Sequence, residues 1–204
     1  MAGKALTRRN DHAVSPVVGV MLMLVVTIII AAIVSAYAGG MTSNQKNVPQ
    51  ATIKGDFSIT RGMTITHTGG DPLPVADLVF TIWDGPTFGQ NVEEITKQKL
   101  DLKNMTDSKG NPVLASDGTY NLTSFKPGDY LLIAANQTSC DVFQPSVAPS
   151  DYEHDMGATY TGTTAIKRFA LCIRNMNNIG NKFVLTVSDK DGNLIAKTDV
   201  TVTG

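Results

Sequence analysis

The chain has 204 residues, of which 42% are hydrophobic and 17% charged, enough for one membrane-spanning helix and one domain of about 150 residues. Its 17 basic and 18 acidic side chains nearly cancel, which argues against a nucleic-acid-binding protein because no net field attracts phosphates. The sequence contains no G-x-S-x-G elbow, phosphate-binding loop or C-x-x-C motif, so neither an enzyme nor a bound cofactor or metal is predicted.

The first residues carry positive charge ahead of a long apolar run. Lys4, Arg8 and Arg9 precede this run, and only Asp11 opposes them. Because the cytoplasmic flanks of membrane helices are enriched in Lys and Arg, the amino terminus is expected in the cytoplasm. Residues 41–204 are then expected on the outer side of the membrane.

The apolar run extends from Val14 to Ala38 without a charged, histidine or side-chain amide residue. As a helix it reaches roughly 37 Å, which exceeds the hydrocarbon core of about 30 Å. Its apolar residues occur on every side, so the helix must be surrounded by lipid or by other apolar helices. Ser15 and Pro16 fit an N-cap and a first helical position, and the helix is predicted to begin there.

Three explanations of this run lead to different functions. A secretory signal peptide would be cleaved after Ala36-Tyr37-Ala38, although such signals have apolar regions of only about 7 to 15 residues. An uncleaved anchor would tether an outer domain. A cut before the run would leave the helix in the mature protein as a polymerisation element.

A family resemblance rests on the sequence HAVSPVVGV at residues 12–20, preceded by Arg8-Arg9 and followed by the apolar run. This arrangement resembles the class III signal peptide of archaeal type IV pilins. The sequence HTGGD at residues 67–71, with LVF at 78–80, is similar to the opening of the head domain in that family. The resemblance covers residues 1 to 83 and leaves the rest without a recognised motif.

The resemblance implies that a membrane prepilin peptidase cuts between Ala13 and Val14. It divides the chain into a leader (1–13), a transmembrane and filament-core helix (14–40), a linker (41–50) and an extracellular head (51–204). Two departures from related proteins are His12, where the family usually has Lys or Arg, and Val18, where bacterial pilins have glutamate. Implied partners are identical subunits in a helical filament, the peptidase, and an assembly ATPase with its membrane platform.

Small residues repeat every four positions near the end of the helix, in two rows that lie side by side: Ala31, Ser35 and Gly39, and Ala32, Ala36 and Gly40. Such rows let helices in membranes approach closely. The alternative is that alanine is simply frequent in apolar helices and that the glycine pair ends this one. The glycine pair is also a candidate hinge to the head.

Short apolar alternations broken by Gly, Pro, Asn and Asp follow from Ala51 and are typical of strands and turns. Strands are predicted at residues 52–60, 63–68, 75–83, 92–102, 130–135, 166–174, 183–188 and 194–202. The last pair flanks the turn sequence DKDGN at residues 189–193 and predicts a hairpin. The fold class expected is α+β, a long apolar helix followed by an antiparallel β-sandwich.

The outer part carries candidate modification sites. Asn104, Asn121 and Asn136 each begin an N-x-[ST] sequon and are candidates for N-glycosylation. Cys140 and Cys172 are candidates for a disulfide in an oxidising exterior, and buried free thiols are the alternative. A bond between them would tie the base of residues 141–164, which are predicted to form a long exposed loop.

These observations favour a pilin, the structural subunit of an archaeal type IV pilus-like filament used for adhesion. The motility filament of archaea, the archaellum, is a close variant. The competing class is a monomeric β-sandwich binding protein that is membrane-anchored or secreted. The mature amino terminus separates them, because Val14 indicates a pilin, Gly39 a secreted protein and Met1 an anchor.

Overall fold

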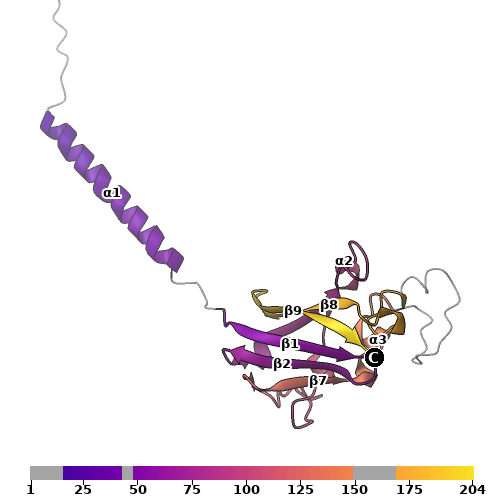
Figure 1. Cartoon of the computed structure of the whole chain (residues 1–204). Coiled ribbons are helices and arrows are strands. Elements are labelled where there is room, and N and C mark those ends of the chain that lie inside the picture. Colours follow the sequence, from indigo (N-terminus) through magenta and orange to yellow (C-terminus); the bar gives the residue numbers. More distant parts are fainter. Residues whose placement is uncertain (1–15, 43–47, 149–168) are drawn as a thin grey trace, which may run out of the picture. The chain divides into compact units, whose positions relative to one another are not determined.

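A single long helix occupies the first part of the chain. The computed structural model describes residues 16–42, 48–148 and 169–204. In it, α1 (Pro16–Thr42, 27 residues) is one continuous helix (Figure 1). It begins at the expected proline and continues past Gly40 to Thr42, because glycine weakens a helix without removing a backbone hydrogen bond. Linker residues 43–47 lie outside the described parts.

The second unit, Val48–Gly204, is built on a seven-stranded sheet. The strand order is β5-β4-β8-β9-β1-β2-β7, and β3 and β6 form a separate two-stranded sheet. The strands are β1 (Ala51–Ser58), β2 (Gly62–Gly70), β3 (Leu73–Pro74), β4 (Leu78–Asp84), β5 (Gln98–Lys99), β6 (Ser124–Phe125), β7 (Tyr130–Ala134), β8 (Lys182–Asp189) and β9 (Leu194–Thr203).

Short helical elements connect the strands. In the described parts these include the α-helical α2 (Glu93–Thr96) and α3 (Cys140–Phe143). The others are 3-10 turns, η1 (Val75–Asp77), η2 (Leu102–Asn104), η3 (Ala135–Gln137) and η4 (Met176–Asn178). A β-rich domain after a long helix confirms the expected α+β class.

The sheet is mostly antiparallel and curled. Its two antiparallel groups, β5-β4-β8-β9 and β1-β2-β7, are joined where β1 and β9 run parallel, with Phe57 opposite Val202 and Ser58 opposite Thr203. The strands therefore form one continuous sheet rather than the two separate sheets of the expected sandwich. Both groups direct apolar side chains into one core. Phe57 of β1, for example, meets the ring of Phe183 of β8 edge-on, with centroids 5.6 Å apart.

The predicted strands at residues 52–60, 63–68, 75–83, 130–135, 183–188 and 194–202 correspond to β1, β2, β4, β7, β8 and β9. The predicted hairpin is also present. In its turn, Gly192 has φ of 89°, a conformation that glycine adopts without strain. The Asp189 carboxylate accepts a hydrogen bond from the backbone of Asn193 at 2.8 Å.

Two predicted strands are wrong. Residues 92–102 hold α2 and the short β5 instead, because the Thr96 hydroxyl bonds to the Val92 carbonyl at 2.8 Å and favours a helical turn. The described part of 166–174, residues 169–174, begins with the helical residue Phe169 and continues as turns. Its carbonyl groups accept hydrogen bonds from side chains, as when the Asn178 amide donates to Cys172 at 2.8 Å, so a strand ladder is not needed to satisfy them.

The exposed loop predicted from residue 141 is also wrong over its described part, residues 141–148. This segment contains most of α3 and carries the buried residues Phe143, Gln144 and Val147. The Phe143 ring stacks against Phe57 of β1, with centroids 6.0 Å apart. Apolar residues in a Pro- and Ser-rich stretch thus belong to the domain's interior. Residues 149–164 lie outside the described parts.

Candidate assembly helix and modification sites

Helix α1 presents an apolar surface on every side. None of residues 16–38 is buried within the chain, and their length and composition suffice to cross a membrane. Thr27, near the middle of the helix, donates its hydroxyl to the Leu24 carbonyl at 2.8 Å, so this polar group is already satisfied. A helix of this kind is stable only where lipid or neighbouring apolar helices cover it.

The small residues proposed for packing lie on this helix. Ala31, Ala32, Ser35 and Ala36 are all exposed, and the backbone of Gly39-Gly40 continues the same helix. Gly19 is a further small position, because a methyl group added there would meet no atom of the chain within 4 Å. Within the described residues, no contact therefore explains these small side chains.

The residues predicted for processing precede α1. Pro16 is the first helical residue, whereas Ala13, Val14 and Ser15 lie outside the described residues. Cleavage between Ala13 and Val14 stays a prediction. Such a cut would leave the whole of α1 in the mature protein.

Cys140 and Cys172 lie together in the interior. Both are buried free thiols, and they share a small apolar cluster with Val147. A hydrogen bond with the Cys172 thiol, together with burial, raises the pKa of the Cys140 thiol. The expected disulfide stays a prediction, but the fold brings its two sulfurs to one place.

A buried polar network borders this cluster, and sequence reasoning missed it. The Gln144 amide donates to Oδ1 of Asp84 at 2.8 Å, and its carbonyl oxygen accepts the backbone N–H of Ile173 at 2.7 Å. Burial raises the pKa of Asp84 to about 7. Strand parity could have found this acid, because Asp84 follows the inward-facing residues Leu78, Phe80 and Ile82 at every second position.

The three sequons differ in exposure. Asn121 and Asn136 are exposed, whereas Asn104 is half-buried in η2. The Asn121 side chain donates its amide to the Pro112 carbonyl at 2.8 Å. Asn136 lies in η3 and presents its side chain to solvent.

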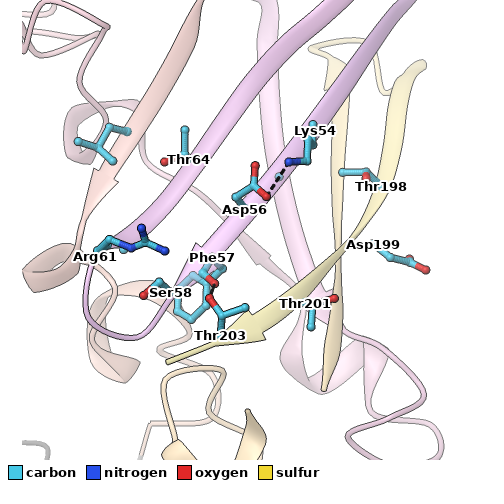
Figure 2. Close-up of a pocket in the computed structure, with 13 residues that line it drawn as sticks. Lys54, Asp56, Phe57, Ser58, Arg61, Thr64, Thr198, Asp199, Thr201 and Thr203 are labelled. Atoms are coloured by element: carbon cyan, nitrogen blue, oxygen red, sulfur yellow. Dashed lines mark hydrogen bonds and ion pairs between the residues drawn. The ribbon is translucent and has the colours of Figure 1, made fainter. Parts of the chain in front are cut away.

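A shallow groove of about 930 Å³ is lined by residues of β1, β2, β7 and β9. Figure 2 shows Lys54 and Asp56 of β1 joined by an ion pair of 2.9 Å, with Thr198 and Asp199 of β9 nearby. Both members of the pair are well exposed, so it contributes little to stability. In the described parts of the chain, no group of three His, Cys, Asp or Glu side chains is placed to hold a metal ion.

The length and composition of this helix suffice to cross a membrane, and a β-rich domain follows it in the chain. Comparison with known proteins shows what this part of the chain is similar to. Residues 12–53 match the family described as archaeal type IV pilin, N-terminal, which confirms the resemblance seen in the sequence.

A similar protein is found in Archaeoglobus fulgidus. It is named as an uncharacterized protein and is 31% identical over 71 residues. The match covers 32% of this chain and 48% of that protein, so the chain spans about half the length of this relative.

Proposed function

We propose that this chain is a pilin, the structural subunit of an archaeal type IV pilus-like filament on the cell surface, used for adhesion. The observation that carries the proposal is α1. It matches the family over residues 12–53, and its apolar surface is uncovered on every side. A structural rather than an enzymatic role follows.

In this proposal a prepilin peptidase cuts between Ala13 and Val14 while the helix lies in the membrane. The helix then leaves the bilayer and packs among the helices of identical subunits. Lipid tails and apolar side chains are equally apolar, so the hydrophobic free energy of this transfer is near zero. Close packing between helices then determines whether the helix joins the filament. An assembly ATPase and its membrane platform would therefore drive the process.

The two small-residue rows are the proposed close-approach surface between subunits. Val18, the fifth residue of the proposed mature chain, is apolar and exposed. Register between subunits would then depend on side-chain shape rather than on a buried charge pair. This makes the rows sensitive to an increase in side-chain size.

The test enlarges one side chain on each side of the helix. Ala31→Leu places a larger group in a row, and Ile30→Phe is the matched control because 3.6 residues per turn put Ile30 roughly opposite the rows. We expect Ala31→Leu to reduce filament yield at least tenfold and Ile30→Phe to leave it within about twofold, as measured by sheared surface protein. Equal membrane levels of the subunit exclude an insertion defect.

The mature amino terminus decides between the function classes. Sequencing of the surface protein is expected to begin at Val14. A chain that begins at Gly39, or an intact chain that forms no filament, would instead support the secreted or anchored binding protein.

A further inference from the structure

Two segments on either side of residues 149–168 are held together in the domain interior. Cys140 is the first residue of α3, and Cys172 follows a turn in which its backbone N–H donates to the Phe169 carbonyl at 3.0 Å. The two cysteines are 0% and 1% exposed. With Val147 they form a buried cluster of their own, separate from the main core.

Contacts other than sulfur fix this approach. Gln144 lies one helical turn after Cys140, and its side chain accepts the backbone N–H of Ile173, the residue next to Cys172, at 2.7 Å. The Asn178 amide donates to the Cys172 carbonyl at 2.8 Å. Each cysteine is thus positioned by its neighbours, and both lie in one buried cluster.

The local chemistry favours a bond between the cysteines over the alternatives. Both thiols are buried, which argues against a solvent-accessible reactive cysteine, because reactive cysteines are partly exposed. In the described residues no third ligand completes a metal site with the two sulfurs. What remains is a closely placed pair of thiols in a domain that the proposed function puts outside the cell, where disulfides persist.

We propose that Cys140 and Cys172 are joined by a disulfide in the exported protein, closing the chain around residues 149–168. The proposal rests on the extracellular location in the proposed function. Two S–H bonds break and one S–S bond forms. The two protons and two electrons pass to the disulfide of a donor protein, whose S–S bond breaks as it is reduced to a dithiol.

Trypsin gives a direct test, because it cuts after Lys167 and Arg168 between the two cysteines. Full-length protein from the cell surface is denatured, alkylated with iodoacetamide without reductant, and digested. Lys126 precedes a proline and resists cleavage, so we expect residues 110–167 and 169–174 to appear as one linked pair. The pair should separate only after treatment with dithiothreitol.

Single variants provide the matched controls. Cys140→Ser and Cys172→Ser are expected to abolish the linked pair and to leave the remaining cysteine alkylated before reduction. If both cysteines of the native protein are alkylated without reductant, the proposal is overturned. A mature terminus at Val14 with two free thiols would refute the disulfide alone, whereas a linked pair in a chain that forms no filament would refute the proposed function alone.

Discussion

The buried acid Asp84 makes the stability of the head dependent on pH in an unusual direction. Its carboxyl group is fully buried at the end of β4, where Oδ1 accepts a hydrogen bond from Gln144 at 2.8 Å. No donor in the described residues reaches Oδ2. Burial therefore outweighs this hydrogen bond and raises the pKa from 3.8 to about 7, so the folded domain favours the protonated acid.

The sign of the effect follows from the two protonation equilibria. Below pH 3.8 the acid is protonated in both the folded and the unfolded chain, and the folded state has its full stability. Between 3.8 and about 7 the unfolded chain loses the proton while the folded chain keeps it, so stability falls as pH rises. The full shift corresponds to about 4 kcal/mol, and the loss is complete above the folded pKa.

Replacing the acid by the neutral amide in Asp84→Asn removes this loss. The amide oxygen still accepts from Gln144, so we expect the variant to be more stable than the native chain at pH 7.5 by about 1–4 kcal/mol. At pH 4 the difference should largely vanish. Urea unfolding of the full chain in detergent, followed by fluorescence of its single tryptophan, Trp83, measures both values.

Asp199→Asn is the matched control, because Asp199 is exposed on β9 and its replacement removes one surface charge. It should leave the difference in stability between pH 4 and pH 7.5 as it is in the native chain. A variant at Asp84 that is less stable than the native chain at pH 7.5, with an unchanged pH dependence, would refute the reasoning.

Two further predictions concern packing and modification. A methyl group on Gly55 would lie 2.5 Å from Cγ2 of Val200, whereas one on Gly69 would meet no atom within 4 Å. Gly55→Ala should therefore lower the free energy of unfolding in urea by about 1–3 kcal/mol, and Gly69→Ala should lower it much less. Asn136 is exposed, whereas the Asn121 amide is held by a backbone carbonyl. Asn136→Gln should thus lower the intact mass of the surface protein by one glycan and Asn121→Gln should not, and the reverse result would contradict this ranking.

The long helix could be predicted from sequence because its cause is local. A run without charges that is apolar on every side admits few structures, since each backbone group must be satisfied within its own segment in lipid. The start at Pro16 followed from the same local rules. The predicted hairpin at residues 189–193 succeeded for this reason too, because its turn chemistry is contained in adjacent residues.

The predictions failed where distant groups decide the structure. Residues 92–102 alternate like a strand, but the hydroxyl of Thr96 accepts the backbone N–H of Asp84 at 2.9 Å and holds a helical turn against β4. Residues 169–174 look like an apolar strand, yet amide side chains from outside this segment satisfy their carbonyl groups. A pattern within the segment contains none of this information.

The helix and the head obtain their stability from different sources. Substitutions in the two parts should therefore change different measurements. The head has its own buried core, so substitutions at Asp84 or Gly55 should change urea unfolding. Residues 16–38 are exposed and apolar on every side of the helix, and a helix of this kind needs lipid or other apolar helices around it. Ala31→Leu should therefore reduce assembly while leaving the unfolding of the head unchanged. If it also lowered the urea midpoint reported by Trp83, the small-residue row would be serving the fold of the single chain rather than contacts between subunits.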